Sequence, residues 1–214
     1  LEGLFGAVEK VVTTKELIDK NTLASLKIKC IILRHPNIRE KMDYAEEIEY
    51  LVTNEKRTDF VVNLLRHLRG NTLCLFQLVE KHGKILNDRM KEEENVYFVY
   101  GGTDTSEREK IRGLVETHSK STTIASFGVF STGVNIRNIN NIVLASPSKS
   151  KIRVLQSIGR GLRTSSSKDS VLVYDISDDI SYNDRRNFTL NHFTERLNIY
   201  NEEQFDYDIS RVKL

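Results

Sequence analysis

Three side chains between residues 148 and 163 could hold a chain of phosphate groups. The segment reads SKSKIRVLQSIGRGLR, and Ser148 at its start follows a proline, where a helix N-cap is favoured. If the segment is helical, Gln156, Arg160 and Arg163 lie on one stripe, because their spacings are four and three residues. Guanidinium groups keep their charge and donate hydrogen bonds in a planar fork that suits phosphate. The segment therefore predicts a phosphate clamp made of two arginines and a glutamine.

A long acid-free stretch surrounds this clamp. Residues 117–168 contain eight Lys or Arg and no Asp or Glu, a charge of +8, whereas the rest of the chain carries −6. The net charge of +2 over 214 residues therefore hides a strongly basic region. Such a region is typical of a surface that meets a polyanion, either nucleotide phosphates or a nucleic-acid backbone. A solvated basic face balanced by an acidic neighbour is the alternative.

The composition is that of a globular protein. Hydrophobic residues make up 39% and charged residues 29% of the chain, which argues against disorder. No run approaches the roughly 18 apolar residues of a membrane helix, so we expect a cytoplasmic protein without a membrane partner. Cys30 and Cys74 are too few for a disulfide framework, and both lie in apolar runs, which predicts buried thiols. The five histidines show no paired metal-ligand spacing, so we expect no metal site in this chain.

Apolar, β-branched runs alternate with helix-like stretches. This alternation predicts βαβ units and a mostly parallel sheet with helices on both faces. Ligands of such sheets lie beyond the carboxyl ends of the strands, so we expect a site in the loops after Tyr100, Phe127 and Ser146. Ser106 and Glu109 form a capping-box pattern that predicts the start of one helix. The strand-like runs are residues 26–33, 71–77, 95–100, 121–127, 141–146 and 170–176.

Several of these segments resemble motifs of superfamily 2 helicases. QSIGRGLR fits the motif VI pattern Q-x-x-G-R-x-x-R through Gln156, Gly159, Arg160 and Arg163, and TTIASFGVFSTGVNI resembles motif V. NTLCLFQ resembles the motif IV strand, and VYFVYGGTDTSEREKIR resembles the strand, glycine turn and helix that follow it. The resemblance covers about residues 1–180, and in detail the sequence of these motifs is similar to that of helicases of T-even bacteriophages.

The resemblance implies a fold and a domain organisation. The fold is α/β and RecA-like, of the P-loop NTPase type: a mostly parallel sheet flanked by helices, with a small C-terminal helical tail. Residues 1–22 would lead in from a first RecA-like domain, residues 23–180 would form the second RecA-like domain, and residues 181–214 would form a helical tail packed on it. Because Leu1 opens an already amphipathic segment, we expect the C-terminal part of a longer protein.

The sequence lacks one half of an ATP site. It contains no G-x-x-x-x-G-K-[ST] loop and no D-E-x-H run. In the family, both lie in the first RecA-like domain, which holds the phosphates of ATP and Mg²⁺. The resemblance therefore implies that Arg160 and Arg163 reach the γ-phosphate of ATP as arginine fingers, with Gln156 beside them. It also implies that this chain alone hydrolyses no ATP.

The resemblance assigns further contacts to small residues. Asn135 stands where the family has an aspartate that meets the ribose, and its amide can still hydrogen-bond a hydroxyl. The nucleotide contacts would come from Gly133, Asn135 and Gly159. The nucleic-acid strand would meet backbone amides and small hydroxyls of Gly101, Gly102, Thr103, Ser126 and Thr132.

The implied function is that of an ATP-dependent DNA helicase or translocase. It would remodel branched or duplex DNA in recombination, repair and replication, with RNA–DNA hybrids as a further candidate substrate, in the bacterial host cytoplasm if the protein is phage-encoded. Two alternatives stay open: a non-catalytic nucleic-acid-binding or regulatory module with a degenerate RecA-like fold, and a dinucleotide-binding enzyme, although no G-x-G-x-x-G follows any strand. Tyr97, Phe98 and Tyr100 could stack on bases, but strand alternation predicts that they are mostly core.

Overall fold

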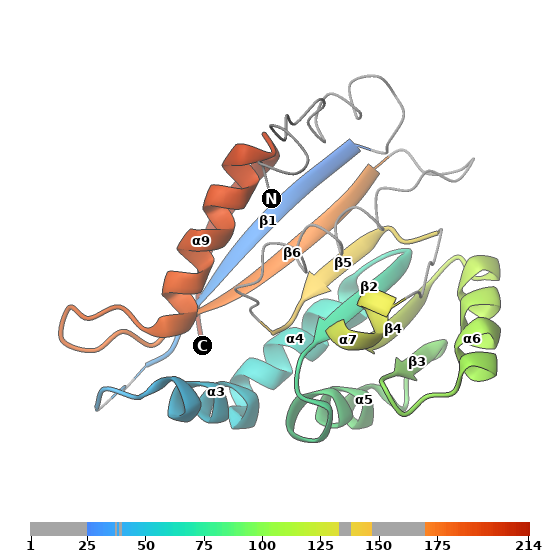
Figure 1. Cartoon of the computed structure of the whole chain (residues 1–214), viewed down its shortest axis with the longest axis horizontal. Coiled ribbons are helices and arrows are strands. Elements are labelled where there is room, and N and C mark those ends of the chain that lie inside the picture. Colours follow the sequence, from blue (N-terminus) through green and yellow to red (C-terminus); the bar gives the residue numbers. More distant parts are fainter. Residues whose placement is uncertain (1–24, 37, 39, 133–137, 147–169) are drawn as a thin grey trace, which may run out of the picture.

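A seven-stranded parallel sheet organises the chain (Figure 1). The structure is a computed structural model that describes residues 25–36, 38, 40–132, 138–146 and 170–214. The strand order is β3-β4-β2-β5-β6-β1-β7, and every neighbouring pair is parallel. The predicted mostly parallel sheet is therefore confirmed. The strands are β1 (Ser25–Arg34), β2 (Asn71–Phe76), β3 (Val96–Val99), β4 (Ser121–Ser126), β5 (Asn141–Leu144), β6 (Ser170–Asp179) and β7 (Asp206–Lys213).

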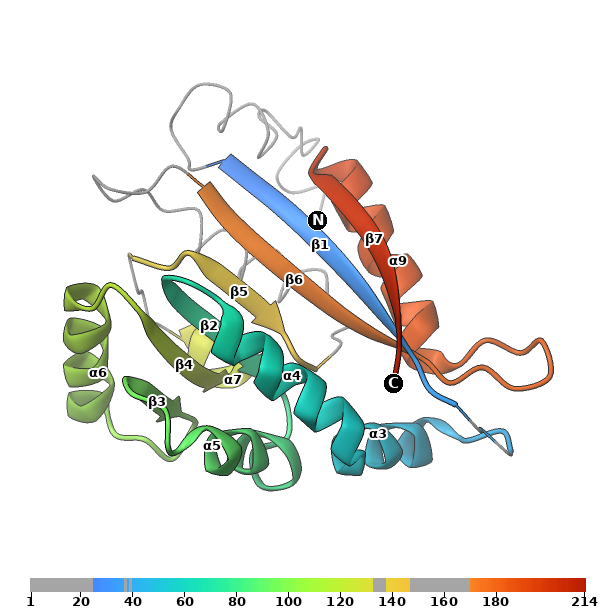
Figure 2. The ribbon, with the colours of Figure 1, turned by 180° about the vertical axis from the view of Figure 1, so that it is seen from behind.

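Helices cover both faces of the sheet. Figure 1 shows α9 on one face, and Figure 2 shows α4 on the other. The first face also carries α6 and α7, the second carries η1 and α5, and α3 packs against α4, η1 and α9. The helices are α3 (Tyr44–Thr53), α4 (Glu55–His67), the π-helical turn η1 (Val79–Gly83), α5 (Lys84–Met90), α6 (Thr105–Thr117), α7 (Phe127–Thr132) and α9 (Phe188–Glu202).

Alternation along the strands divides the core into two layers. In β2, Leu73 and Leu75 belong to the layer under α6 and α9, whereas Cys74 and Phe76 belong to the layer under α4 and α5. A strand buried on both faces reads as a continuous apolar run, as β2 does. Cys30 and Cys74 are both buried, as predicted. Burial raises the pKa of the Cys74 thiol to about 12, so this thiol stays protonated and unreactive.

Helix α6 begins earlier than the sequence predicts. Its N-cap is Asp104, whose carboxylate accepts the backbone N–H of Glu107 at 2.9 Å and the hydroxyl of Ser106 at 2.7 Å. The predicted capping box of Ser106 and Glu109 is therefore wrong. The reason is that a carboxylate directly after the glycine turn is a strong acceptor for the free N–H groups of the first helical turn.

The C-terminal residues form α9 and then a strand that the sequence did not predict. The chain leaves β6, runs through α9 across β1, and adds β7 to the free edge of the sheet. Most side chains of β7 are exposed, so its apolar pattern is weak. Only Tyr207 and Val212 pack against the core, one on each face.

A buried ion pair fastens α9 to β6. Arg196 donates to the two carboxylate oxygens of Asp175 at 2.8 and 2.7 Å, and neither side chain reaches solvent. Tyr200 donates its hydroxyl to the same carboxylate at 2.8 Å, and Arg196 also donates to Ser177 at 2.6 Å. Because the carboxylate is fully paired, its charge is tolerated in the core.

The pair predicts a large effect of one substitution. Arg196→Met leaves the Asp175 carboxylate buried without its cation, and we expect the free energy of unfolding to fall by about 3–5 kcal/mol. Urea denaturation measures this loss. Lys27→Met is the matched control, because Lys27 pairs with Asp208 at the surface, where the two side chains are 55% and 67% exposed, and should cost at most about 1 kcal/mol. Equal losses in the two variants would contradict the role of the buried pair.

Candidate functional site

Two loops predicted to contact nucleic acid lie at neighbouring strand ends. Residues 101–103 follow β3, and Ser126 is the last residue of β4. Strands β3 and β4 pair directly, with Val99 opposite Ala125. The carboxyl ends of parallel strands meet at one edge of the sheet, so the structure brings these residues together there. Thr132 ends α7, the short helix that follows β4.

The turn after β3 exposes its glycine backbone. The hydroxyl of Thr103 accepts the N–H of Tyr100 at 3.1 Å, and the Thr103 N–H donates back to the Tyr100 carbonyl at 3.0 Å. A Cβ on Gly102 would lie 2.6 Å from the Tyr100 ring, which explains that glycine sterically. A Cβ on Gly101 would meet nothing within 4 Å. A need for glycine at position 101 would therefore come from a group outside the described part of the chain.

The remaining predicted site residues lie outside the described residues. The connection from α7 to β5 includes Gly133 and Asn135, and the connection from β5 to β6 includes Gln156, Gly159, Arg160 and Arg163. The structure describes the points from which both connections start. These are Thr132 at the end of α7 and Ser146 just beyond β5.

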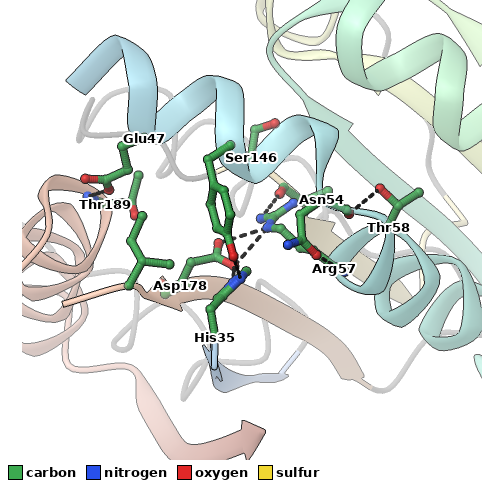
Figure 3. A network of polar contacts seen from close by, with 12 residues as sticks. His35, Glu47, Asn54, Arg57, Thr58, Ser146, Asp178 and Thr189 are labelled. Atoms are coloured by element: carbon green, nitrogen blue, oxygen red, sulfur yellow. Dashed lines mark hydrogen bonds and ion pairs between the residues drawn. The ribbon is translucent and has the colours of Figure 1, made fainter. Parts of the chain in front are cut away.

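A buried ion pair lies at the same edge and joins four elements (Figure 3). Arg57 of α4 donates from Nε to both carboxylate oxygens of Asp178 in β6, at 2.9 and 3.0 Å. His35, just after β1, lies 2.9 Å from the same carboxylate through Nε2. Arg57 also donates from Nη2 to the carbonyl of Ala145 at 2.8 Å. The pair therefore fixes the end of β5, directly before the segment that carries the predicted phosphate clamp.

Asp178 is charged despite its burial. Burial by itself would raise the pKa of this carboxyl, but the Arg57 guanidinium and the hydrogen bonds from His35 and Arg57 outweigh it and hold the pKa below its ordinary value. The carboxylate thus remains an anion at neutral pH and keeps its two partners, Arg57 and His35, in place.

His82 holds Ser146 from the other side. Its Nδ1 lies 2.8 Å from the Ser146 hydroxyl, which also accepts the N–H of Gln77 at 3.3 Å. Burial, together with the nearby charge of Arg57, lowers the pKa of His82 to about 3, so the imidazole is neutral. Its Nε2 has no hydrogen-bond partner among the described residues, and the side chain lines a cavity of about 300 Å³ under α3.

These residues could hardly be predicted from the sequence. Arg57 stands in an amphipathic helix, where a charge usually faces solvent, and it meets Asp178 across 121 positions of chain. The available signal was in SVLVYDISDD, where two of the three acids, Asp175 and Asp178, interrupt a run that otherwise reads as a buried strand. A buried carboxylate needs a cationic partner, so this run indicated that basic side chains are buried beside it. It did not indicate which basic residues these are.

The ranges that the structure describes hold neither a candidate metal cluster nor a helix that could span a membrane. No group of three or more His, Cys, Asp or Glu in those ranges could hold a metal ion. No helix in the same ranges is long and apolar enough to cross a membrane.

Comparison with known proteins decides the family. The model of the helicase conserved C-terminal domain matches residues 55–165, slightly more than half of the chain. The chain belongs to this family. The matched region begins at α4, which carries Arg57, and ends in the connection after β5, which carries the predicted clamp.

The relatives agree with this assignment. The chain is 36% identical to the ATP-dependent DNA helicase uvsW of Enterobacteria phage T4 over 231 residues, which cover 99% of this chain and 46% of that protein. The crystal structure of T4 UvsW matches with a TM-score of 0.75 and 35% identity, over 89% of this chain and 42% of that one. The C-terminal domain of the DEAD-box protein Dbp5 matches with a TM-score of 0.58 and 16% identity, over 89% of this chain and 90% of that one, which shows the fold alone.

These matches confirm two predictions. The RecA-like α/β fold and the resemblance to superfamily 2 helicases of T-even bacteriophages both hold. The chain spans less than half the length of the phage T4 helicase.

His82 predicts how stability depends on pH. The ordinary histidine pKa of 6.5 applies to the unfolded chain, whereas the folded value is about 3, so between these values only the unfolded chain binds the proton. The free energy of unfolding should therefore fall below pH 6.5, with a contribution from His82 of at most about 1.4 kcal/mol per pH unit. In His82→Asn, where an amide can replace Nδ1 at Ser146, this contribution should vanish.

Urea denaturation at pH 7.5, 5.5 and 4.5 tests this, with the exposed His67→Asn as the control variant. The prediction fails if wild type and His82→Asn lose stability in parallel as the pH falls.

Proposed function

We propose that this chain is the C-terminal motor domain of an ATP-dependent DNA helicase or translocase. The observation that carries the proposal is the 36% identity, over nearly the whole chain, to a phage T4 protein named as an ATP-dependent DNA helicase. By this likeness, the whole protein remodels branched or duplex DNA in recombination, repair and replication, and RNA–DNA hybrids are a further candidate substrate. Its place of action would be the cytoplasm, that of the bacterial host if the protein is phage-encoded.

ATP would bind between this domain and the first RecA-like domain of the same polypeptide. Arg160 and Arg163 act as arginine fingers on the γ-phosphate, with Gln156 beside them, and fingers of this kind are worth about 10³–10⁵ in rate. The acid-free +8 stretch around them supports this role. The remaining nucleotide contacts come from Gly133, Asn135 and Gly159.

The first domain supplies the phosphate loop and Mg²⁺, so this chain alone does not turn over ATP. This division of roles between the two domains agrees with the absence of acidic residues around the two arginines, because guanidinium groups bind phosphate oxygens but cannot coordinate Mg²⁺. Arg57 fixes the Ala145 carbonyl and His82 binds Ser146, so the finger segment starts from a rigid base.

The DNA strand would cross the carboxyl ends of β3 and β4. Backbone amides and small hydroxyls contact its phosphates, which positions the strand without reading its sequence. The open space at Gly101 supports this contact, because it lets a phosphate approach the main chain closely. The residues of this track are Gly101, Gly102, Thr103, Ser126 and Thr132.

Opening and closing of the two domains then couples ATP to movement along DNA. Arg160 and Arg163 bridge the cleft when ATP is present, and hydrolysis removes the γ-phosphate that they hold. A domain that transmits such a step must move as one body. The buried pairs of Asp178 with Arg57 and of Asp175 with Arg196 support this requirement, because each joins different helices to the sheet.

One substitution separates this proposal from a non-catalytic nucleic-acid-binding module. In the full-length protein, Arg160→Ala should lower the DNA-stimulated ATPase rate by at least about 10³-fold and leave DNA affinity nearly unchanged. Lys91→Ala is the matched control, because Lys91 is exposed just after α5, lies outside the acid-free stretch, and its removal also takes away one positive charge. Turnover of ATP and DNA binding are measured on the same preparations.

Normal ATP turnover in Arg160→Ala would overturn the finger assignment. If Arg160→Ala turns over ATP normally but no longer binds DNA, Arg160 acts in DNA binding only. That result would favour the view that this chain is a non-catalytic nucleic-acid-binding module.

A further inference from the structure

Three aromatic side chains meet at the carboxyl edge of the sheet. Tyr44 opens α3, Phe188 opens α9, and His192 lies one turn further along α9. The Tyr44 ring lies 5.9 Å from the Phe188 ring and 5.7 Å from the His192 ring, edge-on in both contacts. Tyr44 and Phe188 are 44% and 40% exposed, although large apolar rings are normally covered. We call these three residues the aromatic platform.

The platform is held rigidly from below. Glu47 is buried between α3 and α9, and its carboxylate accepts the backbone N–H groups of Phe188 at 2.8 Å and Thr189 at 2.5 Å (Figure 3). The side-chain amide of Asn187 donates to it at 2.9 Å. A buried carboxylate is stable only when its oxygens are well hydrogen-bonded, so Glu47 fixes the start of α9 against α3. The exposed rings therefore keep one arrangement.

Basic side chains border the platform. Lys41, Arg185 and Arg186 line, together with Phe188, a hollow of about 370 Å³. Among its described lining residues, the one acid is Glu47, whose carboxylate already binds the start of α9. The free charge of the hollow is therefore positive.

A tight turn projects the arginines past the end of β6. Tyr182 and Arg185 exchange two backbone hydrogen bonds of 3.1 and 3.0 Å, and Asn183 and Asp184 between them have φ values of 45° and 59°. Two consecutive residues with positive φ are typical of a type I′ hairpin turn. The loop between β6 and α9 stands out from the sheet in Figure 1.

We infer that the aromatic platform and this basic hollow form a second contact for a single DNA strand. One unpaired base stacks on the face of one of the two rings, because Tyr44 and Phe188 lie edge-on to each other at 79° and share no face. The adjacent phosphates lie against Arg185 and Arg186. Exposed aromatic faces flanked by cations are what a single strand requires, because every base has a π face and every link has a charge. The inference rests on the proposed function, which brings DNA to this edge.

The spacing between this proposed site and the glycine turn after β3 suits a single strand of DNA. Strand β6, which leads into the hollow, is four positions from β3 in the sheet. Neighbouring strands are about 4.8 Å apart, so the carboxyl ends of β6 and β3 are about 20 Å apart across the sheet. A single strand of several nucleotides spans both. The acids at the start of α3, Asp43 and Glu46, are engaged with each other's backbone N–H groups in a capping box.

Stacking is tested with oligonucleotides that carry 2-aminopurine at successive positions and bind to the full-length protein. The double variant Tyr44→Ala with Phe188→Ala should raise the Kd for single-stranded DNA by at least about tenfold and abolish the fluorescence quenching at one position. Tyr44→Phe with Phe188→Tyr should retain both. Ile209→Ala is the matched control, because Ile209 is equally exposed at 43% but lies on β7.

Charge is tested by salt dependence. Arg185→Ala and Arg186→Ala should each weaken binding and lower the slope of log K against log salt by about 0.7, the value for one phosphate contact on a single strand. Lys213→Ala on β7 should leave the slope unchanged. Unchanged quenching and Kd in the ring variants would overturn the inference while leaving the proposed function intact.

Two further outcomes identify other failures. A wild-type protein that binds neither single-stranded nor branched DNA would overturn the proposed function itself. Ring variants that bind DNA normally but lose ATP turnover would show that the platform contacts the first domain, which also overturns the inference.

Discussion

The organisation of the functional edge depends on the contact between Asp178 and Arg57. The two side chains meet in the interior with nearest distances of 2.9 and 3.0 Å, and both are closed to solvent. Through them, α4 is joined to β6, to the end of β1 at His35, and to the end of β5 at Ala145. A buried carboxylate without a cation strongly destabilises the folded state. The elements around Asp178 must therefore pack in the arrangement that brings Arg57 into contact with it. The start of the segment that carries Arg160 and Arg163 is therefore positioned by a contact buried in the interior of the domain.

The same solution recurs across the domain. Asp175 with Arg196 fastens α9 to β6, and Glu47 binds the first amides of α9. Buried charges contribute little net stability compared with apolar side chains, but they define which surfaces meet and in what register. This suits a domain of the helicase family, in which loops from several strands must act on one ligand. The exposed rings of Tyr44 and Phe188 and the open backbone at Gly101 are the parts that this framework leaves free for partners.

The sequence predicted the sheet well because its strands are buried on both faces and read as apolar runs. It failed for β7, since an edge strand with exposed side chains has no such run, and it misplaced the cap of α6 because two acceptors, Asp104 and Ser106, compete within one turn. The motif residues could be predicted from the sequence because their spacing is local. Arg57 and Asp178 were not, because partners 121 positions apart leave no local pattern. Residues such as Arg160 and Asn135 were predicted from resemblance, and their positions lie outside the described residues.

A double-mutant cycle on this pair tests the central claim most directly. The free energy of unfolding is measured by urea denaturation at neutral pH for the wild type, Arg57→Met, Asp178→Leu and the double variant. If the pair organises this edge, Arg57→Met alone costs about 3–5 kcal/mol, and the double variant costs much less than the sum of the two single changes, with a coupling of about 3 kcal/mol. Additive losses, with a coupling below about 0.5 kcal/mol, would contradict the claim.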